Sequence, residues 1–299
     1  MTKLERIRLL DRLINNCKFQ VLITISATLL LCIIHWLAAG RLVVKEMEIH
    51  LTHTHSQILD KHSQTGRTRE LSVALLTDLH GGASVYRDDI AHVVDKTNSL
   101  GADLVLIVGD AIDAPREMIE ERMEPLRHLR ARLGVYYTTG NHEYYYGDVA
   151  EWIELFKAYG IRTLLNERVD IDGAICLVGL NDQSAWKSGI HSNEMHALGD
   201  CPLNDPVVVL AHNPAAADKI IEYGAGLNRT VDLILSGHTH AGQYVVIVPY
   251  VYWLLPYFYG IYDLNGGETK LLVSAGTLYQ GSPMKTPMMS EIWLLRLKY

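Results

Sequence analysis

The sequence predicts an α/β fold in which two packed β-sheets are covered by helices, preceded by one membrane-spanning helix. Two observations support this prediction. From residue 71 onward, short apolar runs typical of strands alternate with amphipathic helical patterns, and an uncharged stretch, residues 19–39, precedes them. The chain has 299 residues, of which 48% are hydrophobic and 20% charged, so it can hold one large globular domain or two small ones.

Residues 19–39 contain no charged side chain when histidine is counted as neutral. A membrane span needs about 20 apolar residues. A buried core helix would show a polar face, and a signal peptide would combine an apolar region of about 7–15 residues with a small-residue cleavage site. Polar residues are only scattered here, and Leu37-Ala38-Ala39 is a poor cleavage site. We therefore expect a short segment at 1–18, a membrane anchor at 19–39 and one domain at 43–299.

The basic residues that flank this stretch are distributed unevenly. Five precede it and two follow it closely: Lys3, Arg6, Arg8, Arg12 and Lys18, then Arg41 and Lys45. Because Lys and Arg accumulate on the cytoplasmic side, we expect a cytoplasmic N-terminus and a luminal or extracellular domain. One glycosylation sequon, Asn228-Arg229-Thr230, fits that placement, but such sequons often arise by chance. Whether Asn228 is glycosylated, and which membrane the protein occupies, stays open.

Charge and cysteine content argue against two further classes of protein. The formal net charge is −7, whereas a nucleic-acid-binding protein is expected to present a basic face. We therefore expect no nucleic acid partner. The four cysteines lack C-x-x-C spacing, which predicts neither a disulfide framework nor a zinc knuckle.

The first half of the predicted domain reads as one strand, a loop and three helices. Residues 44–51 largely alternate apolar and polar side chains, as a half-buried strand does, and the polar, histidine-rich residues 53–66 are interpreted as a loop. Helical patterns follow at 86–100, 116–133 and 149–159. Each of the three is followed by a glycine, which commonly ends a helix.

The second half combines hairpins with one short helix. Residues 169–180 read as two strands turned at Asp172-Gly173, and residues 261–274 read as a second hairpin with a glycine-containing turn. Residues 214–223 predict a short helix with proline in its first turn. Residues 291–298 read as a final strand.

Polar side chains follow five further predicted strands, at the point where each strand ends. These strands are residues 71–77, 103–108, 135–139, 207–210 and 231–235. The polar residues that follow them are Asp78, His80, Asp110, Asn141, His212, His238 and His240. Ligands of open α/β sheets bind at the carboxyl ends of strands, and imidazole suits transition metals. Any one of these residues could be a capping aspartate or a core histidine, but seven at strand ends predict a metal site.

These strand ends carry motifs that resemble the signature of the calcineurin-like metallophosphoesterases. The motifs are Asp78-Leu79-His80, Gly109-Asp110 followed by Asp113, Gly140-Asn141-His142-Glu143, His212 and Gly237-His238-Thr239-His240. They agree with the family in order and spacing over roughly residues 70–299. Within the family, the anchor and the run Ser-Gly-His-Thr-His-Ala-Gly-Gln at 236–243 are similar to a membrane-anchored branch. The resemblance implies a four-layer α/β/β/α sandwich with two metal ions at the sheet edge.

The resemblance also implies a set of ligands for each ion. Asp78, His80, Asp110 and His240 would hold one ion, and Asp110, Asn141, His212 and His238 the other, with Asp110 bridging. Two divalent ions about 3.5–4 Å apart can bind both the attacking and the leaving oxygen of an in-line displacement. Bound cations lower the pKa of water, so a hydroxide that bridges them would be the nucleophile. Mn, Zn, Fe and Mg are the candidates, and the sequence does not distinguish them.

His142 and Asp113 are the remaining site candidates. The resemblance implies that His142 is the general acid for the leaving oxygen and that Asp113 orients it. The alternative is that Asp113 only caps the helix that begins near Pro115. Phosphoprotein phosphatases of the family have Arg-Gly after this aspartate, whereas this chain has Ala114-Pro115. The missing arginine argues against protein phosphatase activity.

The resemblance implies a metal-dependent phosphoric ester hydrolase. The expected substrates are phosphate esters, in particular phosphodiester or pyrophosphate bonds of lipids or small molecules. The alternatives are a membrane-bound nuclease and a non-catalytic metal-binding scaffold. The net charge of −7 counts against a nuclease, and the presence of every expected ligand counts against a scaffold. The sequence determines neither the physiological substrate nor the oligomeric state.

Residues 244–260 contain no charged side chain, seven aromatic residues and two prolines. They are too short and too interrupted for an ordinary membrane span. Two interpretations stay open: a buried strand and helix that close the core, or a segment at the membrane interface, where Tyr and Trp are favoured. In the second, the side chains that partly face lipid are Tyr250, Tyr252, Trp253 and Tyr257.

Overall fold

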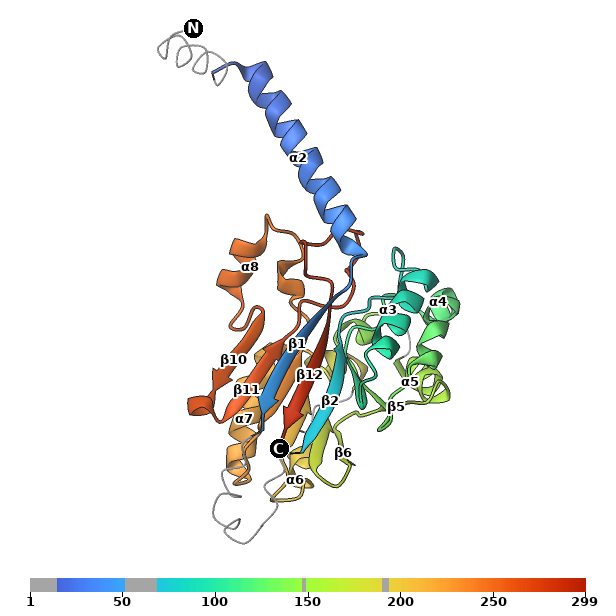
Figure 1. Cartoon of the computed structure of the whole chain (residues 1–299), viewed down its shortest axis with the longest axis vertical. Helices are drawn as coiled ribbons and strands as arrows, with labels where there is room; N and C mark the ends of the chain where they lie inside the picture. Colours follow the sequence, from blue (N-terminus) through green and yellow to red (C-terminus); the bar gives the residue numbers. More distant parts are fainter. Residues whose placement is uncertain (1–14, 52–68, 147–148, 190–193) are drawn as a thin grey trace.

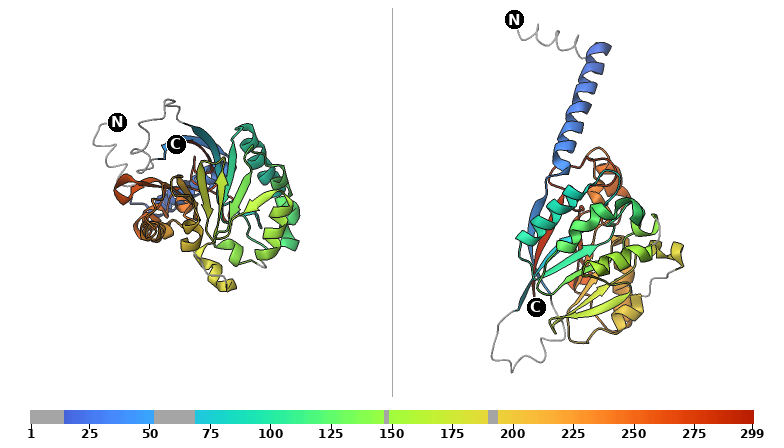
Figure 2. Two further views of the ribbon diagram at one scale, coloured as in Figure 1. Left: turned by 90° about the horizontal axis from the view of Figure 1, so that it is seen from below. Right: turned by 90° about the vertical axis from the view of Figure 1, so that its right-hand side faces the viewer.

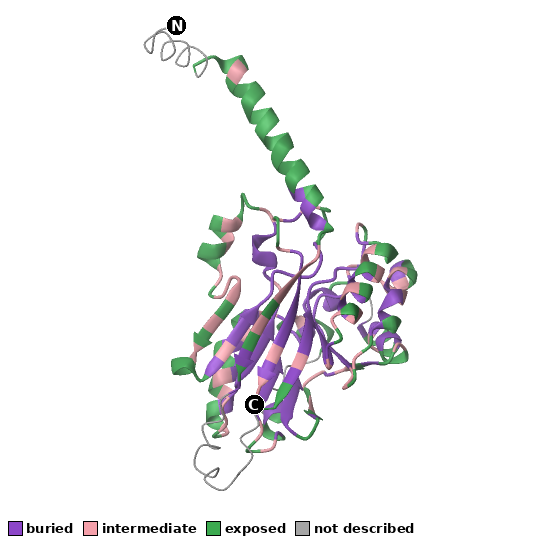
Figure 3. Cartoon of the chain, in the orientation of Figure 1, coloured by how far each residue is buried: buried purple, intermediate pink, exposed green. Residues whose placement is uncertain are grey.

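The computed structural model describes residues 15–51, 69–146, 149–189 and 194–299. One long helix, α2 (Cys17–Ala39), projects from a domain built on two β-sheets (Figure 1). Within the described residues it is the one helix that is long and apolar enough to cross a membrane. Most of its side chains are exposed, and only His35, Ala38 and Ala39 are buried, where the helix meets the domain (Figure 3). The helix covers the predicted stretch 19–39.

Each sheet has six strands. The first has the order β1-β12-β2-β3-β4-β5, with β1 (Val43–His50), β2 (Glu70–Leu76), β3 (Leu104–Val108), β4 (Val135–Thr138), β5 (Ile161–Thr163) and β12 (Glu291–Lys298). The second has the order β10-β11-β9-β8-β7-β6, with β6 (Glu167–Ile171), β7 (Ile175–Gly179), β8 (Val207–Leu210), β9 (Leu233–Ser236), β10 (Gly260–Leu264) and β11 (Thr269–Val273). The central strands of both sheets are parallel.

The two sheets pack face to face around an apolar core. Leu75 and Leu106 of the first sheet belong to the same buried cluster as Leu177, Leu210 and Leu235 of the second. The outer faces are covered by helices (Figure 2): α3 (Arg87–Ser99), α4 (Arg116–Met123) and α5 (Val149–Ala158) on the first sheet, and α6 (Glu194–Gly199) and α7 (Ala217–Gly226) on the second. The predicted α/β/β/α order is confirmed, and it buries both apolar faces of each sheet.

Strand direction brings the ends of the parallel strands close to the base of α2. Strand β1 begins at Val43, shortly after α2 ends at Ala39, and it pairs parallel with β12, which is antiparallel to β2. Because β2, β3 and β4 run opposite to β1, they end where β1 begins (Figure 1). The side chains predicted at these strand ends therefore gather at the end of the domain that carries the long helix.

Most of the predicted elements are confirmed, including the final strand as β12 and both hairpins. The predicted helix 116–133 is wrong beyond Met123, where α4 ends and a 3-10 helix, Glu124–His128, follows. Pro125 explains the break, because proline has no N–H to donate and its ring clashes with the preceding turn of an α-helix. The predicted loop 53–66 lies outside the described residues.

The prediction of no disulfide is wrong. Cys176 in β7 and Cys201, which lies before β8, form a disulfide bond with their Cα atoms 5.7 Å apart. Motif spacing reports only on cysteines that are close together in sequence. A disulfide instead requires that two Cα atoms approach within about 7 Å in the folded chain. Cys17 and Cys32 in α2 are free and exposed.

Residues 244–260 form α8 (Val248–Leu254) and the approach to β10. No residue of α8 is buried, so the interpretation of this helix as part of the core is wrong (Figure 3). Tyr250, Tyr252 and Trp253 are exposed. Tyr257 differs, because its ring packs edge-on against Tyr262 and its hydroxyl donates a hydrogen bond to Asp218 at 2.8 Å. The domain therefore holds Tyr257 more closely than the other three aromatic residues.

Candidate metal centre

The structure brings all seven predicted strand-end residues into one cluster between the two sheets. Asp78 and His80 follow β2, Asp110 follows β3, Asn141 follows β4, His212 follows β8, and His238 and His240 follow β9. His80 Nε2 lies 2.9 Å from His240 Nε2, and His212 Nε2 lies 3.0 Å from Asp110 Oδ2. His238 Nδ1 lies 2.8 Å from Asn141 Oδ1. Six of the seven are buried and His238 is half-buried.

Unusual backbone conformations aim these side chains. Five of the seven residues have positive φ angles, between 48° and 73°: Asp78, His80, Asp110, His238 and His240. Residues other than glycine rarely adopt this region. Each instance costs about 1–3 kcal/mol and persists where the surrounding structure holds it, most often at functional sites. Gly109 is a further constraint, because a Cβ there would lie 2.4 Å from His212 Nδ1. The chain thus tolerates local strain to assemble the cluster.

The donor atoms form two groups that suit metal ions. Asp78, His80 and His240 form one, and Asp110, His212 and His238 form the other, with the ligand-type atoms of each group within 4.8 Å of one another. Burial, with the charges of His80 and Lys285, holds the pKa of His240 well below its ordinary value, so its imidazole is neutral. Within the described part of the chain, the buried His240 Nδ1 has no hydrogen-bond partner. Carboxylates and imidazoles are donors that zinc, iron and manganese accept, so the residues present fit a metal centre.

Asp113 holds two imidazoles with a single oxygen. Its Oδ1 accepts hydrogen bonds from His142 Nδ1 at 2.6 Å and from His80 Nδ1 at 2.8 Å. It does not cap α4, whose N-cap is Pro115 and has no side-chain cap bond. Burial disfavours a charged imidazole, but the hydrogen bond to Asp113 and the charge of Asp110 raise the pKa of His142 above its ordinary value. A raised pKa favours the protonated form that a general acid needs.

Glu143 lies in the Gly-Asn-His-Glu motif, but the motif alone indicates no role for it. Its fully buried carboxylate accepts hydrogen bonds from four backbone N–H groups: Asp110 (3.0 Å), Ala111 (2.7 Å), Ile112 (3.3 Å) and Gly140 (2.5 Å). Burial and the charge of Asp110 raise the pKa of Glu143 to about 7, while these N–H donors act in the opposite direction. Glu143 therefore ties the loop that carries Asp110 to the loop that carries Asn141.

Replacing Glu143 by alanine is expected to lower the free energy of unfolding, by about 1–3 kcal/mol for each N–H group left buried without an acceptor. The melting temperature of the full-length protein in detergent should fall by about 2–4 °C per kcal/mol. Glu121→Ala is the matched control, because Glu121 is an exposed glutamate of α4 and should change stability by no more than about 0.5 kcal/mol. Equal melting temperatures for the two variants would contradict this role of Glu143.

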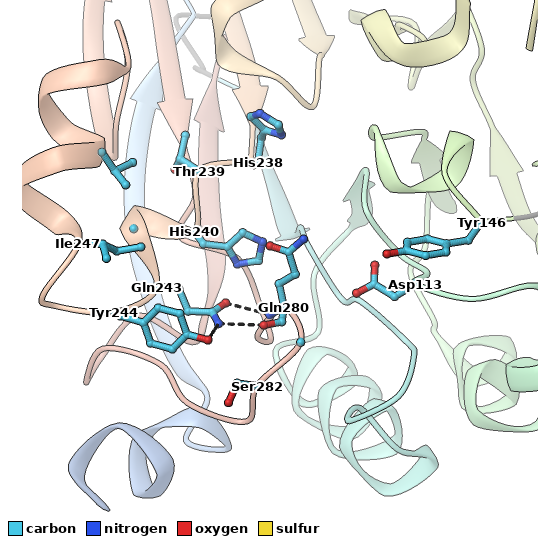
Figure 4. Close-up of a pocket in the computed structure, with 13 residues that line it drawn as sticks. Asp113, Tyr146, His238, Thr239, His240, Gln243, Tyr244, Ile247, Gln280 and Ser282 are labelled. Carbon is cyan, nitrogen blue, oxygen red and sulfur yellow. Dashed lines mark hydrogen bonds between the residues drawn. The ribbon is translucent and has the colours of Figure 1, made fainter. Parts of the chain in front are cut away.

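Two glutamines connect His142 to the segment that leads into α8. Gln280 Nε2 lies 2.8 Å from His142 Nε2. Gln243 holds Gln280 through two hydrogen bonds, because its Nε2 donates to Gln280 O and its Oε1 accepts from Gln280 N, both at 2.9 Å (Figure 4). The sequence offered a signal for Gln243 in the run after His240, but none for Gln280.

A cavity of about 520 Å³ opens in front of these residues. Asp113, His238 and His240 line its polar side, and Ile247 and Val251, at the start of α8 and within it, line another side (Figure 4). The cavity therefore joins the Asp/His cluster to an apolar wall formed by α8.

The fold and the cluster together define a metal-binding α/β sandwich. Residues 71–242 match the family model for the calcineurin-like phosphoesterases, so the chain belongs to that family.

Individual relatives of this chain are also named as metallophosphoesterases. The chain is similar to the transmembrane protein with metallophosphoesterase domain of Bos taurus, with 38% identity over 76% of this chain and 53% of that one. It is 34% identical to a metallophosphoesterase of Helicobacter pylori strain J99, over 77% of this chain and 60% of that one. The chain thus spans little more than half the length of these relatives. Among solved structures, a dimetal phosphatase from Danio rerio aligns with a TM-score of 0.45 and 14% identity, over 74% of this chain and 90% of that one.

Proposed function

We propose that this chain is a membrane-anchored phosphoesterase that depends on two divalent metal ions. The observation that carries the proposal is the convergence of Asp, Asn and His donors from five strand ends in one buried cluster. Asp78, His80, Asp110 and His240 would hold one ion. Asp110, Asn141, His212 and His238 would hold the other, with Asp110 shared. Mn, Zn, Fe and Mg are the candidate ions.

When bound, such ions would neutralise phosphate charge and lower the pKa of water. His142 would donate its Nε2 proton to the leaving oxygen, while Asp113 holds the opposite ring nitrogen at 2.6 Å. Gln280 lies against that Nε2, so its carboxamide would turn its oxygen toward the N–H whenever His142 is protonated there. In this scheme the chain itself supplies the ligands, the acid and the group that orients the acid.

The proposed substrates are phosphate esters, in particular phosphodiester or pyrophosphate bonds of lipids or small molecules. The absence of an Arg-Gly pair after Asp113 counts against phosphoproteins. The test is a panel of phosphomonoesters, phosphodiesters and nucleic acids, assayed with added manganese on the full-length protein. Turnover of a small phosphodiester that stops with a chelator is the expected result. Turnover of nucleic acids alone would point to a nuclease, and no turnover of any member would point to a non-catalytic scaffold.

The proposed arrangement has a cytoplasmic segment at 1–18, an anchor at 19–39 and the catalytic domain, 43–299, on the luminal or extracellular side. The bilayer would be contacted by 19–39 and by 244–260. The disulfide between Cys176 and Cys201 supports this orientation, because disulfides persist in oxidising compartments and are rare in the cytosol. Asn228 of the single sequon is exposed, as a glycosylated residue must be.

Mass spectrometry of protein that is alkylated in native membranes before lysis checks this orientation. Cys176 and Cys201 are expected in one non-reduced cross-linked peptide pair, because both sulfur atoms would be oxidised outside the cytosol. Cys17 and Cys32 provide the internal control, since both are free and should carry no disulfide to a neighbour within the domain. Alkylated Cys176 and Cys201 would instead indicate a reducing compartment and contradict the orientation.

A further inference from the structure

Helix α8 presents an apolar, aromatic face that no part of the described chain covers. Trp253 is 82% exposed, and Tyr250 and Leu254 lie on the same side of the helix and are also exposed. Tyr252 lies on another side, where its ring packs edge-on against Phe258. We call Tyr250, Trp253 and Leu254 the α8 outer face. No charged residue occurs anywhere in 244–260. Exposed tryptophan and tyrosine in an uncharged segment are typical of surfaces at the level of lipid headgroups, where an aromatic ring can be apolar at one end and hydrated at the other.

Helix α8 lies at the end of the domain from which α2 projects (Figures 1 and 3). His35 of α2 connects the two segments directly. Its Nε2 accepts a hydrogen bond from Val245 N at 3.2 Å, and its backbone oxygen accepts one from Lys285 N at 3.0 Å. His35 Nδ1 bonds to Leu31 O at 2.7 Å, which leaves Nε2 as the acceptor. The segment that leads into α8 is therefore fixed to the last turns of the anchor.

Helix length sets where the bilayer surface would fall. From Cys17 to His35 the helix rises about 27 Å at 1.5 Å per residue. The hydrocarbon core of a bilayer is about 30 Å thick. A bilayer spanned by α2 would therefore end near His35, at the level where Val245 is attached. Helix α8 is too short to span a bilayer, so in contact with one it would lie in the interface plane.

The inner side of the same helix faces the candidate metal centre. Ile247 and Val251 line the cavity of about 520 Å³ that also contains His238 and His240 (Figure 4). A phosphate group at the Asp/His cluster would therefore have an apolar wall beside its ester substituent. That wall leads to the end of the domain where the bilayer would lie.

We infer that the α8 outer face rests in the headgroup layer of the bilayer that holds α2, and that the site hydrolyses a phosphate ester of a membrane lipid. The lipid keeps its chains in the bilayer, and its phosphate enters the cavity past Ile247 and Val251. The inference rests on the proposed phosphoesterase function, because it names the substrate class of that same site. For a phosphodiester, the reaction adds water across one P–O ester bond and releases an alcohol and a phosphate monoester, so no further reactant is required.

The first experiment measures contact with lipid independently of activity. Full-length protein is placed in phosphatidylcholine nanodiscs with or without brominated acyl chains, which quench nearby tryptophan. Trp36 is replaced by phenylalanine in every variant, because it lies in α2 next to His35, where the bilayer surface would fall, and would be quenched as well. Quenching is expected in Trp36→Phe and is expected to fall at least about twofold when Trp253→Phe is added. Unchanged quenching would overturn the membrane contact.

The second experiment compares two substrates with the same leaving group. One is water-soluble bis-p-nitrophenyl phosphate, and the other is a dioleoylglycerol p-nitrophenyl phosphodiester embedded in nanodiscs. The pair Tyr250→Ser and Trp253→Ser is expected to slow turnover of the lipid ester about tenfold, because apolar contact with the bilayer is lost. Turnover of the soluble ester should stay within about twofold, since neither side chain touches the Asp/His cluster.

Leu203→Ser is the matched control, because Leu203 is an exposed apolar residue on the loop that enters β8 at the end opposite to His212. It should change neither rate.

Hydrolysis of the soluble ester but not of the lipid ester by the unaltered protein would overturn the lipid inference and leave the phosphoesterase proposal standing. If the unaltered protein hydrolyses neither ester, the phosphoesterase proposal is overturned. The quenching result would still decide the membrane contact. A change in oligomeric state without a change in quenching would assign the α8 outer face to a second copy of the chain and overturn the inference.

Discussion

Asp110→Asn is expected to lower metal occupancy at both sites of the cluster. Asp110 is the one carboxylate assigned to both ions, and its Oδ2 lies 3.0 Å from His212 Nε2. Mutation of a residue that only hydrogen-bonds to a metal ligand typically lowers metal affinity by about 10–100-fold. Loss of a ligand shared by both ions should therefore have a larger effect. The fold should survive, because Asn keeps an oxygen in place of the Asp110 Oδ1 that accepts from His142 N at 2.8 Å.

Metal analysis of purified protein checks this result, with the unaltered chain expected to carry two ions. His80→Ala is the comparison variant and should weaken mainly one site, although it also removes a hydrogen bond to Asp113. His238→Ala is the cleaner counterpart for the other site, since His238 bonds to Asn141 and not to Asp113. Two ions retained in Asp110→Asn would show that this carboxylate does not bridge.

His142→Ala is expected to slow esters with poor leaving groups by about 10²–10⁴-fold, because a general acid no longer protonates the departing alkoxide. A nitrophenyl ester should lose far less, since nitrophenolate leaves without a proton. Rates of an alkyl and a nitrophenyl phosphodiester, measured side by side on each variant, check the difference. Equal losses on both would mean that His142 serves another purpose, such as binding the substrate.

The metal content of His142→Ala must be measured as well as its turnover. His142 lies with His80 and Asp110 in a group whose ligand-type atoms are all within 4.8 Å. If His142 were a metal ligand, His142→Ala would lower metal content as well as turnover. We expect unchanged metal content, because Asp113 engages Nδ1 of His142 while Gln280 lies against Nε2. Asp113→Asn is expected to give an intermediate loss with the same dependence on leaving group, because it weakens the orientation of His142 without removing the imidazole.

Much of the candidate site could be predicted from the sequence, because the patterns that mark it extend over only a few neighbouring residues. Each candidate ligand follows an apolar run by one to five residues, and parallel strands end at a common edge. That rule sufficed to expect Asp78, Asp110 and His212 together, although they are far apart in the chain. The membrane-length helix was predictable for a similar reason, since length and lack of charge are properties of the stretch itself.

Other features depended on distances that no sequence pattern expresses. The disulfide between Cys176 and Cys201 exists because β7 and the chain before β8 bring two Cα atoms to 5.7 Å. Gln280 reaches His142 only because Gln243 holds the loop that carries it. Glu143 was visible in a motif, yet its role required knowing that N–H groups from two different loops converge on one carboxylate.

The sequence by itself determined which residues stand at the strand ends and which stretch can span a membrane, because both follow from the order of apolar and polar residues. Only the tertiary structure decided that the strand ends lie beside α2, since this depends on β12 pairing antiparallel with β2 and parallel with β1. It also decided that α8 is exposed. An uncharged aromatic run has the same composition in a core and on a surface, and only the packing of the rest of the chain determines whether anything covers it.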